Sequence, residues 1–347
     1  MRKYLLPENA NSYKANLHAH SNLSDGQYSP EELKELYKAQ GYSVFAYTDH
    51  DIFLQHNDLT DDTFLALNGY EMEVNQKKAD ATLASGCSKT CHMCLIALDP
   101  DKVTPVCWHR EKYLFRNAVN HRDEVQNDPS LPDYERVYSG QGISEMMTLG
   151  KENGFFVTYN HPMWSTEDYL DYTAYNGMHA MEIVNFECVV NGYADRNERV
   201  YDDMLNVGKR IYCVATDDCH GLKGMFGGAT VIKADKLEYK AITDALVNGN
   251  FYATEGPEIK NLYVEDGKLY VESSAAAHIR LNTGTRYAKQ VFNTNGTPVT
   301  RAVFDLPDNG MYYFRVTVTD MGGKCAYSNA YFIDELTEYL AKPVNAQ

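Results

Sequence analysis

The feature that most constrains this sequence is a pattern that recurs along its first three quarters, in which short apolar runs end in ligand-type side chains. The runs at 43–51, 155–162 and 210–220 end in Thr-Asp-His-Asp, Asn-His-Pro and Asp-Asp-Cys-His. Helical stretches are expected at 29–39, 143–154, 195–208 and 237–249. Strands that alternate with helices form βαβ units around a parallel sheet, so the pattern predicts an α/β fold.

The position of the polar residues narrows this fold class further. Side chains gathered at the C-terminal ends of successive strands are typical of a closed or nearly closed β/α barrel, which carries its site on that face. A doubly wound open sheet is the alternative, and it would take its ligands mainly from one crevice. Polar ends on six or seven strands favour the barrel.

Two regions depart from the alternating pattern. Residues 99–140 combine aromatic, basic and histidine residues with little periodicity. A loop of that length is commonly functional or mobile, so we expect a lid or substrate-facing insertion. From about residue 258 the texture becomes all-β, with alternating runs on both sides of an Asp-Gly turn at 266–267. The sequence therefore predicts a barrel domain over 1–257 and a small sandwich-like β-domain over 258–347.

The pair His18 and His20 is the first candidate site. On a strand, residues two apart share a face, so both imidazoles would point the same way. Asp25 follows in a Ser-Asp-Gly turn that can fold its carboxylate back toward them. Two imidazoles and a carboxylate that converge on one point can hold a metal ion. Alone, the pair also fits an ordinary surface strand.

Similar side chains recur at the other strand ends and strengthen this interpretation. The full set is His18, His20, Asp25, His50, Glu71, His92, His161, Asp218 and His220. Nine imidazoles and carboxylates are too many for one tetrahedral ion, and they would supply two or three.

The motifs also carry a resemblance to a known family. The order and spacing of His-Ala-His with Ser-Asp-Gly, Thr-Asp-His-Asp, Gly-Tyr-Glu, Asn-His-Pro and Asp-Cys-His resemble the polymerase and histidinol phosphatase (PHP) superfamily, over about residues 14–257. The resemblance implies a distorted (β/α)7 TIM-like barrel and up to three divalent transition-metal ions, namely zinc, manganese or iron. It implies that the nine residues are metal ligands, with His92 matched by position more than by motif, and that Asp218, His220 and His161 serve catalysis.

One residue departs from the family pattern. Asp217 precedes Asp218 where the family more often has a small residue such as serine. An extra carboxylate there would either support the ligands from behind or alter the metal preference.

The leading interpretation is a metal-dependent phosphoesterase that hydrolyses a small phosphorylated metabolite or nucleotide. Two or three divalent ions would bridge a hydroxide, lower its pKa and clamp the phosphoryl oxygens. Arg110, Arg116 and Lys223 are candidate phosphate-binding cations. An amidohydrolase-type metal hydrolase is one alternative, disfavoured because no lysine stands at a strand end. A non-catalytic, metal-containing binding or regulatory protein, with the β-domain for recognition, is the other.

Composition limits the partners and the compartment. The chain has 32 Lys and Arg against 48 Asp and Glu, a net charge of −16, so no nucleic-acid partner is expected. No apolar run resembles a signal sequence or a membrane span, and eight cysteines in such a chain suggest reduced thiols in a cytoplasmic protein. Cys91 and Cys94 invite a structural-zinc interpretation, but a strand would place them on opposite faces, which favours buried free thiols.

Overall fold

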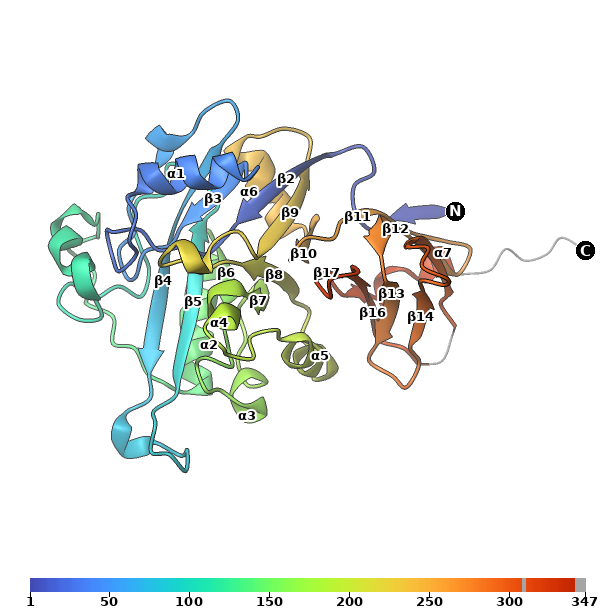
Figure 1. The fold of residues 1–347 in the computed structure, drawn as a ribbon. Coiled ribbons are helices and arrows are strands. Elements are labelled where there is room, and N and C mark those ends of the chain that lie inside the picture. Colours follow the sequence, from blue (N-terminus) through green and yellow to red (C-terminus); the bar gives the residue numbers. More distant parts are fainter. Residues whose placement is uncertain (308–309, 341–347) are drawn as a thin grey trace, which may run out of the picture.

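Figure 1 shows a mixed α/β molecule in which one long sheet continues from the helix-containing region into an all-β region. The structure, a computed structural model, describes residues 1–307 and 310–340. Its helices are α1 (Pro30–Ala39), α2 (Gly140–Glu152), α3 (Tyr169–Tyr172), α4 (Phe186–Val190), α5 (Glu198–Asn206), α6 (Tyr239–Val247) and α7 (Thr337–Leu340). Turns of 3-10 helix are η1 (Asn57–Leu59), η2 (Lys78–Asp80), η3 (Arg116–Glu124), η4 (Leu222–Gly224) and η5 (Ile333–Glu335).

The strands form a fourteen-stranded sheet and a four-stranded sheet. The large sheet contains β2 (Asn11–Asn16), β3 (Val44–Tyr47), β4 (Leu65–Asn75), β5 (Thr90–Ala97), β6 (Phe155–Tyr159), β7 (Ala180–Asn185), β8 (Tyr212–Thr216), β9 (Ala229–Ala234) and β10 (Phe251–Thr254). It continues through β13 (His278–Thr283), β14 (Lys289–Phe292), β16 (Tyr313–Thr319), β17 (Cys325–Ser328) and β18 (Tyr331–Phe332). The small sheet has the order β1 (Arg2–Tyr4), β11 (Ile259–Glu265), β12 (Lys268–Ala276), β15 (Val299–Asp305).

The four predicted helices are confirmed as α1, α2, α5 and α6, with ends shifted by up to three residues. Helix α1 shows why its start could be predicted from the sequence. The Ser29 hydroxyl accepts the Glu32 N–H while the Glu32 carboxylate accepts the Ser29 N–H, and Pro30 occupies the first helical position. This reciprocal capping satisfies backbone donors that would otherwise lack partners at the helix start.

The predicted parallel sheet is present only in part. Parallel pairs are β2 with β3, β3 with β4, β6 with β7 and β7 with β8. Strand β5, which was not among the predicted strands, is antiparallel to both β4 and β6. The link from β4 to β5 contains only the short turn η2, and a connection without a crossover helix returns the chain antiparallel. Strand β9 is also antiparallel, to both β2 and β10.

One apolar cluster lies between the strands of the helix-containing region. It takes a buried residue from every strand from β2 to β9 and from α6, including Ala15, Val44, Leu67, Ile96, Phe156, Ala180, Val214, Ile232 and Ile242. Strand β8 lies beside β9, because the Thr230 hydroxyl accepts the Ala215 N–H at 3.3 Å and donates to the Ala215 carbonyl at 3.1 Å. Within residues 1–307 and 310–340 no backbone ladder joins β8 to β9, so the hydrogen-bonded sheet is an open path.

After residue 258 the chain forms strands, as the alternating sequence pattern predicts. β11 and β12 form a hairpin in which Glu265 lies opposite Lys268. The two linking residues, Asp266 and Gly267, have φ values of 51° and 74°. Positive φ at both central residues is what a type I′ hairpin turn requires, and Asp-Gly is a favoured pair for it.

The expected boundary at 257–258 stays a prediction, and several contacts cross it. Strand β17 pairs with β10, and the N-terminal strand β1 pairs with β11. Tyr327 and Phe332 belong to the same buried cluster as α2 and α5 side chains. Arg315, whose side chain is 1% exposed, forms ion pairs of 3.1 Å with Glu198 and 2.8 Å with Asp202.

A chain that ends at Pro257 is therefore expected to lose its stable fold. Truncation exposes an edge of β10 and removes Tyr327 and Phe332 from the buried cluster that they share with α2 and α5, so apolar surface becomes exposed to water. Thermal melts of the truncated and full-length proteins, followed by circular dichroism, measure the difference. A cooperative melt of the truncated chain at the full-length midpoint would show instead that residues 1–257 fold independently.

The insertion at 99–140 contains the turn η3 and is tied to the rest of the chain by Arg136. The buried Arg136 guanidinium forms an ion pair with Asp51 and donates to the Glu73 carbonyl at 2.8 Å. The Trp108 indole N–H donates to the Asp51 carbonyl at 3.1 Å. Because Asp51 directly follows His50, these contacts hold the insertion against one edge of the candidate site.

Candidate metal centre

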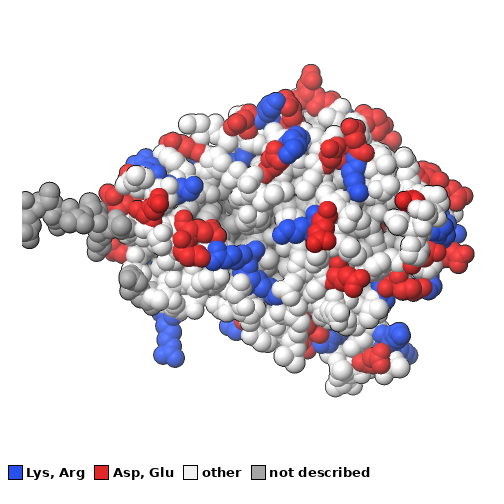
Figure 2. Space-filling view, turned by 180° about the vertical axis from the view of Figure 1, so that it is seen from behind, with Lys and Arg blue, Asp and Glu red and all other residues white. Residues whose placement is uncertain are grey.

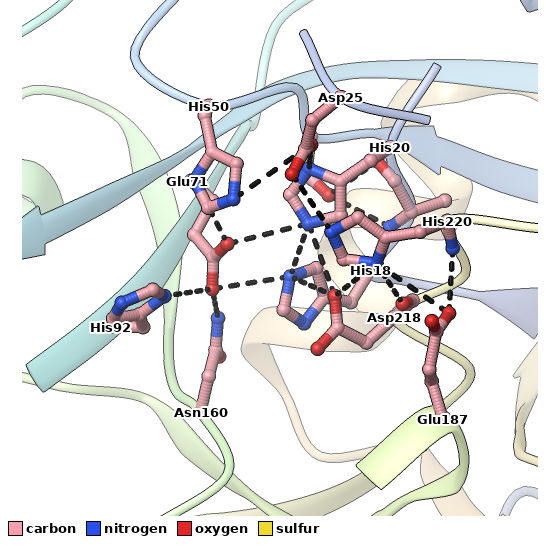
Figure 3. A network of polar contacts seen from close by, with 12 residues as sticks. His18, His20, Asp25, His50, Glu71, His92, Asn160, Glu187, Asp218 and His220 are labelled. Atoms are coloured by element: carbon pink, nitrogen blue, oxygen red, sulfur yellow. Dashed lines mark hydrogen bonds and ion pairs between the residues drawn. The ribbon is translucent and has the colours of Figure 1, made fainter. Parts of the chain in front are cut away.

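The ends of the strands bring the predicted ligand residues together (Figure 3). They come from the segment after β2 (His18, His20, Asp25), the end of β3 (His50), strands β4 and β5 (Glu71, His92), the end of β6 (His161) and the segment after β8 (Asp218, His220). The His18 and His20 Nε2 atoms lie 3.2 Å apart, so both imidazoles point at one centre, as the two-residue spacing predicts.

Three overlapping groups of side chains offer ligand atoms within 4.8 Å of one another. They are His20, Asp25, His50 and His220; His18, His20, Glu71 and Asp218; and His50, Glu71 and His92. The remaining predicted ligand, His161, adjoins them, with its Nε2 3.3 Å from Glu71 Oε1 and 3.8 Å from Asp218 Oδ2. All nine predicted residues therefore lie in one cluster.

Glu71 occupies the middle of this cluster. Its Oε1 lies 3.2 Å from His18 Nε2 and 3.3 Å from His92 Nδ1. Its Oε2 lies 3.3 Å from His20 Nε2 and 3.4 Å from His50 Nδ1. The two carboxylate oxygens thus face two different sets of imidazoles (Figure 3).

The cluster fits a metal because, within the described residues, several of its buried ligand atoms make no hydrogen bond and contact only other ligand residues. His20 Nδ1, His50 Nδ1, His92 Nδ1 and Asp218 Oδ1 are buried and make no hydrogen bond to any residue that the structure describes. A buried polar atom without a partner costs about 1–3 kcal/mol. A cation would satisfy these atoms, and mixed imidazole and carboxylate donors suit zinc, manganese and iron.

Burial and neighbouring charges set the protonation of the imidazoles. Burial and the adjacent His20 lower the pKa of His50 to about 3, which leaves a neutral ring with a free lone pair. Burial also lowers the pKa of His92, but Glu71 and Glu73 raise it more, to a net value of about 10. Burial lowers the pKa of His18 as well, but Asp218, Glu71 and Glu182 together raise it more, so the net shift is upward. A bound metal ion would take the place of these protons.

Three supporting residues were not predicted. Glu182 is fully buried in β7, where its Oε1 lies 2.7 Å from His18 Nδ1 and its Oε2 accepts the His161 N–H at 2.9 Å. Contacts of this kind fix the ring so that its other nitrogen faces a metal. Asn160 donates to Glu71 Oε1 at 2.8 Å, and Glu187 accepts the His220 N–H at 2.6 Å. The sequence sign of a supporting role for Glu182 was its position as a charged residue within an apolar strand.

Asp217 points away from the cluster. Its carboxylate accepts the N–H groups of Phe226, Gly227 and Gly228 at 2.7–3.0 Å and the Tyr37 hydroxyl at 2.7 Å. Burial raises the pKa of Asp217 to about 6. The extra carboxylate therefore holds the turn at 226–228.

The cluster forms the floor of a cavity of about 280 Å³. Arg116 lines this cavity, and Lys223 lies at its edge, donating to the lining residue Asn191 at 2.8 Å. Arg110 lies elsewhere, because it pairs with Asp133 at 2.7 Å and lines a separate cavity. Of the three predicted cations, Arg116 is the one that contacts the cavity directly.

Two further expectations concern the cysteines and the membrane. Cys91 and Cys94 are buried free thiols on β5, three residues apart on a strand, so they do not form a chelating pair. Among residues 1–307 and 310–340, no helix has the length and apolar character needed to cross a membrane.

Comparisons with known proteins give matches only at the level of structure. No family model and no curated protein matches the chain. An amidohydrolase from Chromobacterium violaceum, with bound sulfate and no metal, shares 16% identity over 60% of this chain and 88% of its own, at a TM-score of 0.39. A lesion-specific endonuclease from Pyrococcus furiosus shares 12% identity over 68% of this chain and 56% of its own, also at 0.39. A two-domain protein from Bacteroides vulgatus, described as "containing predicted PHP-like metal-dependent phosphoesterase", shares 15% identity over 95% of this chain and 98% of its own, at a TM-score of 0.44.

Proposed function

We propose that this protein is a metal-dependent phosphoesterase that hydrolyses a small phosphorylated metabolite or nucleotide at a centre of two or three divalent transition-metal ions, namely zinc, manganese or iron. The observation that carries the proposal is the central position of Glu71, whose two oxygens face separate sets of imidazoles. The same proposal includes a distorted barrel formed by residues 1–257 and a β-domain over 258–347.

The nine predicted ligands would hold the ions in the overlapping groups described above. When bound, such ions supply an activated water and neutralise charge on the phosphoryl oxygens. The protein itself positions the side chains of Asp218, His161 and His220 beside the reacting phosphoryl group. Asp218, with Oδ1 3.0 Å from His20 Nε2, and His161 stand on the cavity side of the cluster, where the reacting phosphoryl group would lie. His220 is held there by Glu187 and by its 3.3 Å contact with Asp25.

The rest of the cavity indicates what the substrate carries beside its phosphoryl group. Arg116 provides a guanidinium that suits phosphate oxygens. Phe115, Trp164 and Tyr193 line the same cavity and remain 41%, 38% and 48% exposed. Exposed aromatic side chains around a polar site favour a substrate with a flat ring, which can stack on them. Of the two substrate classes, this observation favours the nucleotide.

The absence of a nucleic-acid partner remains an expectation. The net charge is −16, and on the face seen in Figure 2 the Lys and Arg side chains lie as separate groups among Asp and Glu. A long polynucleotide needs a continuous basic surface to neutralise its phosphates. A mononucleotide needs only the local charge of the metal centre.

A turnover screen tests the proposal. The purified protein, loaded with Mn²⁺ or Zn²⁺, is assayed against phosphomonoesters and phosphodiesters, with nucleotides beside simple alkyl phosphates. Phosphate release that depends on the metal supports the proposal, and faster release from the ring-bearing esters supports the role of the aromatic residues. Metal retention without turnover of any phosphoester would contradict it and favour a binding or regulatory protein. Turnover of amide substrates alone would favour an amidohydrolase-type enzyme.

Two arginines of the insertion, Arg116 and Arg110, provide a matched pair of variants. Arg116→Gln is expected to raise KM by about tenfold, or ~1.4 kcal/mol, because it removes the guanidinium from the cavity. Arg110→Gln is expected to leave KM unchanged, because Arg110 pairs with Asp133 away from the cavity. Steady-state kinetics on the best phosphoester compares the two. Equal effects of both substitutions would remove Arg116 from the substrate site.

A further inference from the structure

A second cavity lies where β2, β9 and β10 meet the start of β11, at the junction of the helix-containing and all-β regions. Its volume is about 430 Å³, and it shares no lining residue with the cavity of the metal centre. We call it the junction cleft. Its walls include Lys14, Lys233, Tyr42, Tyr252, Glu255 and Lys260.

Two lysines of the junction cleft form no direct ion pair among the described residues, although the carboxylates of Asp217 and Glu258 act on them from a distance. The Lys14 ammonium lies 3.9 Å from the centre of the Tyr42 ring and contacts the Gln40 carbonyl at 3.4 Å. The Lys233 ammonium, on a side chain that is almost fully buried, donates to the Ser12 hydroxyl at 2.9 Å. Neither forms an ion pair with any residue in the part of the chain that the structure describes, although the chain has 48 acidic residues against 32 basic ones.

Burial lowers the pKa of both Lys14 and Lys233, because a charged ammonium loses hydration in the cleft wall. Two partly desolvated cations in one cleft would be stabilised by an anion placed between them. Oxyanions such as carboxylates and phosphates accept several hydrogen bonds at once and suit this role.

The cleft also contains a carboxylate oxygen, Glu255 Oε2, that accepts no hydrogen bond from the described residues. Glu255 is 6% exposed, and its Oε1 accepts two hydrogen bonds from Arg196, at 2.7 and 3.0 Å. Its Oε2 is buried and has no hydrogen-bond partner among residues 1–307 and 310–340. A buried carboxylate oxygen in this state would be satisfied by an O–H or N–H donor of a ligand.

The far wall of the cleft is fixed by the protein itself. Phe226 and Gly227, which line it, donate their N–H groups to Asp217, and the Tyr42 hydroxyl donates to the neighbouring Gly228 carbonyl at 2.9 Å. Ligand sites in proteins are usually preformed concave surfaces with a few well-placed polar groups. The junction cleft has this character.

We propose that the junction cleft binds a small organic molecule that combines an oxyanion with a hydroxyl or ammonium group. The oxyanion lies between Lys14 and Lys233, and the donor group satisfies Glu255 Oε2. Tyr42 and Tyr252 enclose the carbon skeleton. This site is independent of the metal centre and of the phosphoesterase proposal.

Calorimetric titration of the full-length, metal-loaded protein tests this site with matched probes. Malate is compared with succinate, and glycerol 3-phosphate with propyl phosphate, so that within each pair only hydroxyl groups differ. The hydroxylated probe of at least one pair is expected to bind about tenfold more tightly than its partner. The pair that binds more tightly identifies the oxyanion as carboxylate or phosphate.

Substitutions then locate the binding. Lys14→Met keeps the aliphatic stem on Tyr42 and is expected to weaken binding at least about tenfold. Lys233→Met serves as the second variant if the first melts early. Glu255→Gln keeps an oxygen for Arg196 and is expected to abolish the preference for the hydroxylated probe. Arg116→Gln, in the metal cavity, is expected to leave the binding of malate and succinate to the junction cleft unchanged. No heat from any probe up to ~10 mM, or binding that survives both lysine substitutions, would overturn the proposal.

Discussion

Asp218→Asn is expected to lower kcat by at least ~10²-fold, about 3 kcal/mol of transition-state stabilisation. The Asp218 Oδ1 forms ion-pair contacts with His20 Nε2 at 3.0 Å and His18 Nε2 at 3.1 Å. Removing its charge leaves the cations that the cluster would hold without this neutralising carboxylate.

The fold should survive this substitution for a specific reason. Asp218 has a φ of 54°, in the left-handed region that asparagine tolerates well. Asp218 does not cap a helix, because η4 begins at Leu222 after Gly221. The substitution therefore does not remove a helix cap.

Steady-state kinetics with circular dichroism as the folding control measures the effect. Asp320→Asn is a matched control, because the Asp320 carboxylate accepts the Gly322 and Lys324 N–H groups in a turn of the β-region, and an asparagine oxygen can do the same. Wild-type turnover in Asp218→Asn would remove this residue from the site and weaken the proposed chemistry.

Removal of metal is expected to abolish turnover and to lower the melting temperature by on the order of 5 °C. A ligand present at a thousand times its Kd stabilises the native state by about 4 kcal/mol, and each kcal/mol corresponds to ~1.4 °C in a chain of 347 residues. The metal would stabilise the fold because it satisfies buried imidazole and carboxylate atoms that make no hydrogen bond to the described residues. Thermal melts of the metal-loaded protein with and without a chelator measure the shift. Equal melting temperatures in the two samples would contradict the prediction.

The same metal site gives a direction for the effect of pH. In the metal-free state the carboxylates raise the pKa of His92 to about 10 and also raise that of His18, so ion binding at neutral pH must displace protons. The pKa values of Asp25 and Asp218 are lowered, so these carboxylates stay charged well into the acid range. Metal occupancy should therefore fall as the pH decreases, through protonation of the imidazoles.

The candidate ligand residues could be picked out from the sequence because their signals are local. His18, His20, His50, Asp218 and His220 each follow an apolar run, and the end of a buried strand fixes where the next few side chains lie. Such positions can be recognised one strand at a time. The clustering of all nine residues follows once the strands lie side by side.

What the sequence did not predict depends on long-range geometry. The reversal of β5 follows from the absence of a crossover helix after β4, and the apolar texture of β5 is the same in either direction. Glu182 supports His18 across 164 positions of sequence. Arg116 and Arg110 have the same chemistry, and only the path of the insertion places Arg116 at the cavity and Arg110 beside Asp133.

The central claim is that the buried cluster holds two or three transition-metal ions, and elemental analysis tests it most directly. The full-length protein is supplemented with Zn²⁺, Mn²⁺ or Fe²⁺, freed of unbound metal by gel filtration, and measured by inductively coupled plasma mass spectrometry. We expect about two to three ions per chain, because the nine residues exceed the needs of a single tetrahedral ion. A protein that retains no metal after supplementation would contradict the account.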